Sequence, residues 1–365
     1  MNPQLLALNV GSTSLKGAFY GIESRDAGKP APTELARAEI QASTDPQERL
    51  TALLESLPAT AGEPAVVVHR IVHGGDHRQG LELGDAVLAD LDALATLAPM
   101  HQPLALAFAR MALARWPAAR HGAAFDTSFH ASLAPWSRRL PIPAEWDAMG
   151  VRRYGFHGLA FTSALRVAAS HDPSVGHGRV VLAHLGGGCS ICAVENGVSR
   201  DTTMGMTPLG GIPGPTRSGD LDPGALLYLL RQRGLKADDI EHRLSHQGGM
   251  AGIAAHGDMR LLIEDNSTEA RLAVELFVVR IAQAIAAMAT GIGGLDHLVF
   301  SGGIGHRAPV LRERILARLA WLGVMVDPDH NTDGALRIDR GKGPGIWNVQ
   351  VDEERELAES AMSWL

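Results

Sequence analysis

The chain has few cysteines: only Cys189 and Cys192 occur among its 365 residues. Two cysteines do not make the disulfide framework that small secreted proteins usually need. We expect both on one strand, where their odd separation puts the two side chains on opposite faces. This arrangement speaks against both a CxxC redox pair and a metal site. The cysteine content therefore favours the cytoplasm as the compartment.

An excess of positive charge and a long apolar run are also absent. Lys and Arg number 33 against 40 Asp and Glu, so the formal net charge is −7. This balance argues against a nucleic acid or a membrane surface as the main partner. No stretch of about 18 apolar residues is free of charge, so we expect no membrane span, and the start of the chain predicts no signal peptide. An apolar content of 45% is typical of a soluble globular protein.

A polar glycine turn between two apolar segments is the most informative feature near the N-terminus. The run LALNVGSTSLKGAFYG predicts strands over 4–9 and 15–22. Backbone N–H groups, hydroxyls and one ammonium meet at the turn, as a bound polyphosphate requires. The pattern is not a Walker loop, because GxxxxGK followed by Ser or Thr is absent; an ordinary serine-rich hairpin is the alternative. The polar residues are Asn9, Ser12, Ser14 and Lys16.

The same pattern occurs a second time, in VVLAHLGGGCSICAVENG. It predicts strands over 180–185 and 190–195, joined by a turn that contains residues 186–188. Asn9 and His184 take equivalent places before the two turns. Two such segments predict two similarly built halves that face each other across a cleft, with chance similarity as the alternative.

Strands alternate with helices along the rest of the chain, which predicts the α/β class. The long apolar helix over 268–290 is expected in the core or in a subunit interface. Segment 23–45 is expected to be loop-rich and peripheral, and a domain boundary is expected near 125–150, where prolines cluster. The other expected strands are 65–72 and 296–301, and the other expected helices are 45–57, 88–96, 103–116, 158–170, 222–234, 308–321 and 353–364.

Several polar clusters lie in loops that contain glycine or proline. Arg70 belongs to an apolar, strand-like segment, where an arginine costs too much free energy unless it is paired or serves a ligand. A capped turn, a core histidine or a surface ion pair is the simpler explanation of each cluster alone. The clusters are HRIVHGGD with Arg70, LAPMHQP with His101, FDTSFH with Asp126, RRYGFHG with His157, TRSGDLDP with Arg217, GDMR with Asp258 and Arg260, and FSGGIG with Gly302 to Gly305.

Together these motifs resemble, in order and in spacing, the acetate kinase family of short-chain acyl phosphate kinases. The resemblance covers nearly the whole chain, and NVGSTSLK, HRIVHGG, FDTSFH, RRYGFHG, TRSGDLDP and GGIG are its most specific parts. It implies the duplicated two-domain α/β fold of actin, hexokinase and Hsp70, with a central cleft. We therefore expect residues 1–130 with the C-terminal helix 354–365 as one domain, and residues 131–353 as a nucleotide-binding and dimerisation domain.

The resemblance implies an Mg²⁺-dependent phosphotransferase that converts ATP and acetate reversibly into ADP and acetyl phosphate by direct in-line transfer. A carboxylate nucleophile needs no general base, so catalysis consists of positioning and of neutralising phosphoryl charge. By the resemblance, Arg70 and Arg217 hold the carboxylate or the phosphoryl group, and His157 stabilises the transition state. Asp126 is the fourth implied catalytic residue, and the metal, Mg²⁺ with Mn²⁺ as an alternative, is expected at Asn9, Asp126 and Glu353.

The resemblance also implies a homodimer and the residues that bind the nucleotide and the acyl group. The phosphate side comprises Asn9, Ser12, Ser14, Lys16, His184, Leu185, Gly186, Gly187 and Gly188. The nucleoside side comprises Asp258, Met259, Arg260, Gly302, Gly303, Ile304, Gly305 and Arg307. The acyl pocket comprises Val72, Met100, Phe156 and Pro208. Val72 favours acetate, because relatives that prefer propionate tend to have alanine there.

The chain departs from the family pattern mainly on the nucleotide side. Gly187, His306 and Arg307 replace an asparagine, an acid and an amide. These departures leave the implied catalytic residues intact, but the nucleotide and phosphoryl-donor preference stays open. One alternative is a kinase for propionate or another short acyl group, and a second is a non-catalytic nucleotide-binding switch of the same superfold. Both arginines argue against the switch, since nucleotide binding alone needs no cations for an acceptor.

Overall fold

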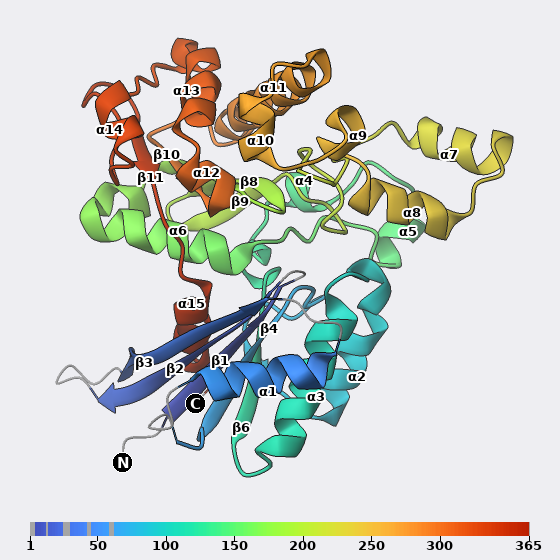
Figure 1. Cartoon of the computed structure of the whole chain (residues 1–365), viewed down its shortest axis with the longest axis vertical. Coiled ribbons are helices and arrows are strands. Elements are labelled where there is room, and N and C mark those ends of the chain that lie inside the picture. The colour runs from blue at the N-terminus through green and yellow to red at the C-terminus, as the bar shows by residue number, and fades with distance from the viewer. Residues whose placement is uncertain (1–3, 12–13, 25–29, 42–44, 58–61, 365) are drawn as a thin grey trace. The chain divides into compact units, whose positions relative to one another are not determined.

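The computed structural model describes residues 4–11, 14–24, 30–41, 45–57 and 62–364 (Figure 1). The chain forms two compact units, and each is described here by itself. Unit 1 contains the segments Met1–Ala131, Phe156–Ser163 and Asp352–Leu365, whereas unit 2 contains Ser132–Gly155 and Ala164–Val351. Two segments distant in sequence therefore join the N-terminal part of the chain in unit 1.

Unit 1 contains a six-stranded mixed sheet in the order β3-β2-β1-β4-β6-β5. Strands β1, β4 and β6 are parallel, whereas β2 is antiparallel to β1 and β3 is antiparallel to β2. The strands are β1 (Gln4–Val10), β2 (Ser14–Ser24), β3 (Pro30–Gln41), β4 (Val66–Ile71), β5 (Leu81–Glu82) and β6 (Arg120–Phe125).

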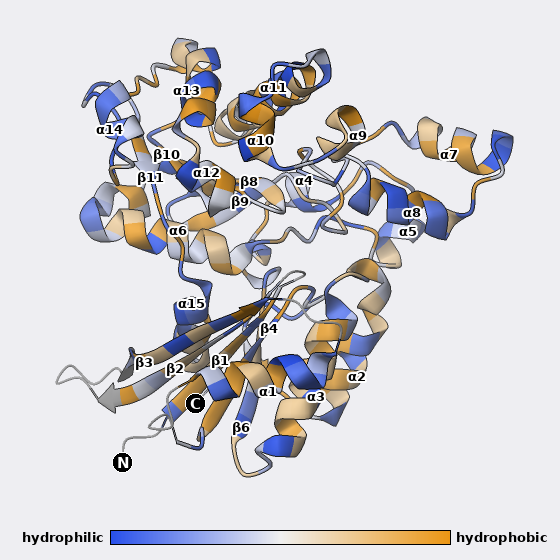
Figure 2. Cartoon of the chain, in the orientation of Figure 1, coloured by the Kyte–Doolittle hydropathy of each residue, from blue (hydrophilic) through white to orange (hydrophobic). Residues whose placement is uncertain are grey.

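Helices cover both faces of this sheet. Leu6 and Leu8 of β1 pack into a core with α1 (Pro46–Ser56), α2 (Asp85–Ala93) and α3 (Gln102–Arg115) on one face. Leu5 and Ala7 point to the other face, because side chains alternate along a strand, and they pack with α15 (Glu353–Ala361). The alternation places Asn9 and Arg70 on the α15 face as well. In Figure 2 the strands of this sheet have apolar stretches that are interrupted by polar ones.

Unit 2 repeats the strand arrangement of unit 1. Its sheet has the order β11-β10-β7-β8-β9. Strands β7, β10 and β11 are parallel, whereas β8 is antiparallel to β7 and β9 is antiparallel to β8. The order β9-β8-β7-β10-β11 therefore matches β3-β2-β1-β4-β6, which confirms the duplication expected from the two glycine turns. The strands are β7 (Arg179–Leu185), β8 (Cys189–Glu195), β9 (Val198–Thr202), β10 (His297–Ser301) and β11 (Gly345–Asn348).

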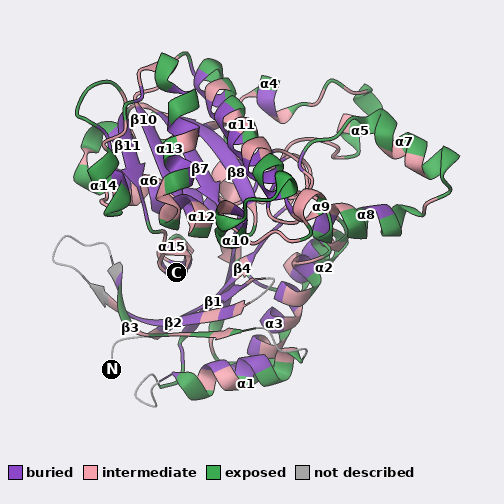
Figure 3. Cartoon of the chain, turned by 45° about the horizontal axis from the view of Figure 1, so that its top comes forward, coloured by how far each residue is buried: buried purple, intermediate pink, exposed green. Residues whose placement is uncertain are grey.

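The helix α11 (Thr268–Gly291) is the main core helix of unit 2. By length and composition it could cross a membrane, but half of its most apolar 18-residue stretch is buried, as in the core helix of a soluble protein. Cys189 packs in the same core, and the two described cysteines are buried and free of disulfides. In Figure 3 the strands of this sheet are almost entirely buried.

The remaining helices connect these elements. The helix expected over 308–321 is α13, which is shorter than expected and follows α12 directly. These helices are α4 (Pro135–Arg138), α5 (Ala144–Ala148), α6 (Gly158–His171), α7 (Pro223–Gln232), α8 (Ala237–His246), α9 (Ala251–Ala254), α10 (Met259–Glu264), α12 (Gly302–Arg307), α13 (Pro309–Arg318) and α14 (Pro328–Thr332), with 3₁₀ turns at Ala95–Leu97, Ser128–His130, Pro173–Gly176 and Ala320–Leu322.

The expectation of a loop-rich segment over 23–45 was wrong for residues 30–41, which form β3. Ala36, Ala38 and Ile40 alternate with polar residues and pack against the α1 side of unit 1. The strand pairs with β2 along its length and forms the edge of the sheet. Apolar and polar residues thus alternate in this segment, but the pattern is weak because its residues are mostly small or charged.

Two buried histidines on the α1 face of the sheet predict acid sensitivity of unit 1. His121 Nε2 donates to the Trp116 carbonyl (3.0 Å), so Nδ1 accepts from His69 Nε2 at 3.4 Å. Burial, and then the neighbouring His121, lower the pKa of His69 to about 3. A histidine whose folded pKa lies below its unfolded value stabilises the fold above the unfolded pKa, and this stabilisation is lost as pH falls.

We therefore expect that His69→Leu flattens the fall in unfolding free energy between pH 7 and pH 4. The pKa difference corresponds to about 3 kcal/mol over this range. Urea unfolding of the parent and the variant at both pH values measures it. Equal losses in the two proteins would show that His69 does not titrate in this way.

Candidate active site

Three polar side chains lie at the carboxyl ends of three neighbouring parallel strands in unit 1. Asn9 is the penultimate residue of β1, Arg70 is the penultimate residue of β4, and Asp126 directly follows β6. Ligands of open α/β sheets usually bind at this edge. All three residues project on the face that α15 covers, which brings residues 117 positions apart in sequence into one cluster.

Arg70 is the centre of this cluster. Its guanidinium contacts Asp126 with two hydrogen bonds, from Nε to Oδ1 (3.1 Å) and from Nη2 to Oδ2 (2.7 Å). Its Nη1 donates to Asn9 Oδ1 at 3.0 Å and lies 3.1 Å from Glu353 Oε2. A bidentate fork of this kind holds a carboxylate in one orientation, because both donors are fixed in one plane.

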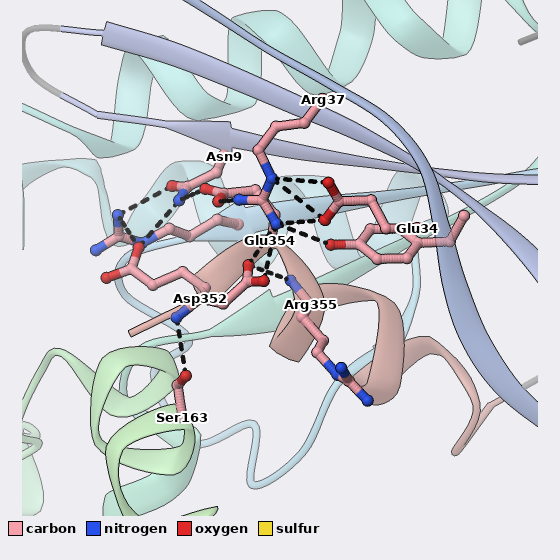
Figure 4. A network of polar contacts seen from close by, with 10 residues as sticks. Asn9, Glu34, Arg37, Ser163, Asp352, Glu354 and Arg355 are labelled. Carbon is pink, nitrogen blue, oxygen red and sulfur yellow. Dashed lines mark hydrogen bonds and ion pairs between the residues drawn. The ribbon is translucent and has the colours of Figure 1, made fainter. Parts of the chain in front are cut away.

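The first turn of α15 supplies the remaining acidic groups. Asn9 Nδ2 donates to Glu353 Oε2 (3.0 Å) and to Glu354 Oε1 (2.6 Å), as Figure 4 shows for Asn9 and Glu354. Within the described part of the chain, no group of three or more His, Cys, Asp or Glu side chains forms a ready metal site. The hydrogen bonds and ion pairs bring Asn9, Arg70, Asp126 and Glu353 together, with Arg70 between the two carboxylates.

The cluster is buried, and its charges are strongly coupled. The Asp126 side chain is 1% exposed and that of Arg70 is 14% exposed. Burial lowers the pKa of Arg70, but the charges of Asp126 and Glu353 outweigh it, so the net shift is upward. Burial raises the pKa of Asp126, while the Arg70 charge and a hydrogen bond from the His157 backbone oppose this rise. Burial and the neighbouring Glu353 raise the pKa of Glu354.

The GFHG motif brings His157 to the same cluster through its backbone. His157 has a left-handed φ of 62°, which is rare for a residue other than glycine and often marks a functional position. The next residue must be glycine, because a Cβ on Gly158 would lie 2.2 Å from the Asp126 carbonyl oxygen. The Gly158 N–H donates to that oxygen at 3.0 Å. The His157 ring packs edge-on against Phe161.

The expected acyl-pocket residues are divided between the units. Val72 and Phe156 are buried in unit 1, and Phe156 packs edge-on against His73. Met100 is half-buried in the turn before α3. Pro208 belongs to unit 2, where its carbonyl accepts a hydrogen bond from Arg217 Nη1 (3.3 Å).

In unit 2 the second glycine turn lies beside α12. The N–H of Gly186 donates to the Gly188 carbonyl (3.1 Å), which closes the turn. Gly302 must be glycine, because it has a φ of 80° and its Cβ would lie 2.5 Å from the Leu185 carbonyl oxygen. A Cβ on Gly305 would lie 3.5 Å from the Leu185 Cβ, which is an ordinary packing distance. This close approach puts the two expected nucleotide segments next to each other.

These segments line one cavity of about 380 Å³ in unit 2. Of the expected residues it is lined by Gly186, Gly187, Asp258, Met259, Arg260, Gly303, Ile304 and Arg307, and it adds Pro215, Gly257, Ile263 and Ala308. Asp258 caps α10 and forms an ion pair with Arg260 (2.8 Å). A Cβ on Gly187 would meet none of the described atoms within 4 Å, so the place of the family's asparagine is open space.

His184 and Ser301 bridge the ends of β7 and β10 in the way that Asn9 and Arg70 bridge β1 and β4. His184 Nδ1 lies 3.2 Å from Ser301 Oγ. The two pairs take equivalent places in the duplicated sheets. Polar side chains therefore gather at the same edge of both sheets, which is the edge expected for ligand binding.

The remaining residues expected on the phosphate side lie at or near the β1–β2 turn. Ser12 lies outside the described residues. Ser14 begins β2, and its carbonyl accepts from the Gly11 N–H (2.8 Å). Lys16 pairs with Asn9 across the β1–β2 ladder, and its charge opposes the upward pKa shift of Glu354.

Sequence reasoning missed Arg37 and Glu354. Arg37 Nη1 donates to Glu354 Oε2 at 2.5 Å, and Figure 4 shows it among several acidic side chains. Glu354 could have been suspected as the neighbour of Glu353. Arg37 had only the weak alternation of β3 as a signal, because its partners Asp352 and Glu354 lie more than 300 positions away in sequence.

Comparisons with known proteins find relatives over nearly the whole chain. The acetokinase family model matches residues 27–354. The acetate kinase of Rhodopseudomonas palustris (strain TIE-1) is 36% identical over 387 residues, which cover 98% of this chain and 97% of the relative. That of Protochlamydia amoebophila is 31% identical with full coverage of both chains.

Solved structures are similar over their whole length. A propionate kinase from Francisella tularensis has a TM-score of 0.86 at 30% identity and covers 100% of both chains. The acetate kinase of Porphyromonas gingivalis has a TM-score of 0.82 at 28% identity and covers 99% of both. These likenesses confirm the expected duplicated two-domain fold. Sequence and structure together show that the chain belongs to the acetokinase family.

Proposed function

We propose that the protein transfers a phosphoryl group reversibly between ATP and acetate, forming ADP and acetyl phosphate. The observation that supports this most directly is the Arg70–Asp126 fork, with Asn9 and Glu353, at the carboxyl edge of three parallel strands. In the forward direction an acetate oxygen attacks the γ-phosphorus, and the bond from phosphorus to the ADP oxygen breaks. The nucleophile carries no proton, so the site needs donors and cations rather than a general base.

The proposed roles follow from what each side chain can donate. Arg70 and Arg217 would hold the acetate carboxylate or the equatorial phosphoryl oxygens, because a guanidinium fork matches both groups. His157 would donate a hydrogen bond to an equatorial oxygen. Its left-handed backbone ties it to Asp126 and therefore to the Arg70 cluster.

Mg²⁺, or Mn²⁺ in its place, is the proposed metal, and Asp126, Glu353 and Asn9 would hold it. These residues fit, because Mg²⁺ takes one or two carboxylates and completes its octahedron with waters and substrate phosphates. Asp126 and Glu353 also place two carboxylates around the single guanidinium of Arg70, while Glu354 pairs with Arg37. When bound, the metal would neutralise charge on the phosphate oxygens.

ATP is proposed to bind with its nucleoside part in the cavity of unit 2 and its phosphates at the Gly186–Gly188 turn. Glycines there let the backbone N–H groups approach the phosphates closely. Arg307 adds a positive charge at the wall of the same cavity, where Arg260 is paired with Asp258.

Acetate is proposed as the preferred acyl substrate, and Val72→Ala is expected to shift the preference towards propionate. Val72 is 4% exposed. Removal of its two methyl groups would make room for one more methylene on the substrate. One buried methylene is worth about 1–3 kcal/mol, so the ratio of kcat/KM for propionate over acetate should rise about 5–150-fold at most. Acetate should bind more weakly, because its methyl group loses contacts.

Steady-state kinetics with both acids measures this ratio. Val67→Ala is the matched control, because Val67 of β4 is also buried but packs on the α1 face. The control should lower stability without changing the ratio. An unchanged ratio in Val72→Ala would remove the size argument for acetate.

The protein is further proposed to be a cytoplasmic homodimer. The ten residues of α7 are all described and none is buried, although Leu227, Tyr228 and Leu230 are apolar (Figure 3). An apolar helix face of this kind is typical of an interface. A second copy of the chain is the partner that the family resemblance implies.

Trapping acetyl phosphate with hydroxylamine tests the proposed function. Protein, Mg²⁺, ATP and acetate should give acetyl hydroxamate, and omission of any one component should abolish it. Product with propionate but not with acetate would favour the propionate alternative. ATP binding without any product would favour the nucleotide-switch alternative.

A further inference from the structure

Arg37, on the edge strand β3, joins the first turn of α15 to the sheet. Its Nη2 donates to both carboxylate oxygens of Asp352 at 2.8 Å, and its Nη1 donates to Glu354 Oε2 at 2.5 Å. Glu34, on the same strand, accepts from Nη2 at 2.7 Å. Figure 4 shows Arg37 surrounded by these side chains. One guanidinium therefore bridges the two neighbours of Glu353.

The register of the sheet explains why Arg37 reaches α15. Ala7, Ala18 and Arg37 form one row across β1, β2 and β3, on the face that packs against α15. The two alanines are small and let the helix approach the sheet closely. Arg37 stands at the end of the row, where a long side chain can extend to the helix terminus.

The residues that Arg37 contacts are themselves held in place. Asp352 is the N-cap of α15, since its Oδ1 accepts from the Arg355 N–H (3.1 Å), and its own N–H donates to Ser163 Oγ (2.9 Å). The Glu354 side chain is 4% exposed and accepts from Asn9 on its other oxygen. Fixing both neighbours fixes the backbone between them, from which the Glu353 carboxylate reaches Arg70.

We infer that Arg37 is a positioning residue for the proposed metal site: it clamps Asp352 and Glu354 and so holds the Glu353 carboxylate towards Arg70 and Asp126. This inference rests on the proposed metal role of Glu353. Arg37 acts through its two acidic partners rather than on the substrate. Groups that orient a metal ligand from outside affect metal affinity, commonly by about 10–100-fold.

A role of Arg37 as a positive charge and a role in positioning Glu353 predict opposite effects on metal affinity, which makes the inference testable. If Arg37 acted only as a positive charge, its loss would make the acidic site more attractive to a divalent cation. If it positions Glu353, its loss weakens metal binding in spite of the more negative surroundings. Lysine keeps the charge but loses the planar fork, so it separates the two effects.

The experiment measures Mn²⁺ binding to the protein–ADP complex by electron paramagnetic resonance, together with the Mg²⁺ dependence of the rate. We expect Arg37→Met to raise the Mn²⁺ dissociation constant about 10-fold, the lower end of that range, because loss of the Arg37 charge acts in the opposite direction. Arg37→Lys should give a smaller rise. The KM for acetate should change little. Unchanged or tighter Mn²⁺ binding in Arg37→Met would overturn the inference, and so would a parent protein that binds no more Mn²⁺ than ADP alone.

Arg110→Met is the matched control, because Arg110 is also in unit 1 and pairs with a single carboxylate, Asp92, on the surface. It should leave Mn²⁺ binding unchanged. If Arg37→Met folds poorly because Glu354 loses its cation, the double variant Arg37→Met/Glu354→Gln removes the stranded charge and should still bind Mn²⁺ weakly. Parent-like binding in the folded double variant would overturn the inference. An inactive parent would instead refute the proposed function.

Discussion

Replacement of Arg70 by alanine is expected to lower kcat/KM by about 10²–10³ and to destabilise unit 1. Loss of one preorganised contact to charge that develops in the transition state costs about this factor. The destabilisation has a separate cause. Asp126 is 1% exposed and loses its bidentate partner, and an ionised carboxylate left unpaired in the interior costs about 3–5 kcal/mol.

Thermal unfolding and steady-state kinetics of two variants separate these effects. Arg70→Lys keeps a cation near Asp126 and should recover much of the stability. Its activity should stay low, because an ammonium cannot replace the planar fork. Parent-like turnover in a folded Arg70→Ala protein would contradict the role proposed for Arg70.

Replacement of Arg217 by alanine should lower kcat by a similar factor, about 10²–10³, with a much smaller loss of stability. Arg217 is half-buried, and its Nη1 donates to the neutral Pro208 carbonyl. Removing a donor from a neutral acceptor strands no charge at that contact, so the cost is far below that at Arg70. Arg70→Ala and Arg217→Ala should thus lose turnover to a similar extent but differ in how much stability they lose.

Arg314→Ala is the control for this prediction, because Arg314 forms an exposed ion pair with Glu275 elsewhere in unit 2. Exposed pairs contribute about 0–1 kcal/mol, so this variant should keep both activity and fold. Arg217→Lys should remain impaired. If Arg217→Ala turned over substrate at the parent rate, Arg217 would have no part in the transfer.

Local patterns in the sequence carried much of the prediction. The two glycine turns indicated the duplication, because each turn joins an antiparallel strand pair whose alternation is visible over a few residues. Arg70 was recognised because a charged residue in an apolar strand must find a partner. The turn at Gly186–Gly188 and the segment at Gly302 were identified as one binding region from the resemblance, and the structure places them against each other.

Patterns with a weak local signal were misread. β3 was expected to be a loop, because an edge strand of alternating small and charged residues gains its stability from pairing with β2 rather than from its own apolar side chains. Because β3 was not predicted, the contact between Arg37 and α15 could not be predicted either. Glu354 was overlooked because a carboxylate beside Glu353 looks like any acidic residue in the first turn of a helix.

The sequence by itself determined the fold class, the duplicated strand pattern, the family and the chemical identity of the site residues, because these depend on local periodicity and on motif order. Only the tertiary structure decided which of those residues meet. Asn9 contacts Glu353 across 344 positions of sequence, and Arg37 contacts Glu354 across 317. Such contacts depend on strand register and on the helix that packs over one face of the sheet, which no short stretch of sequence contains.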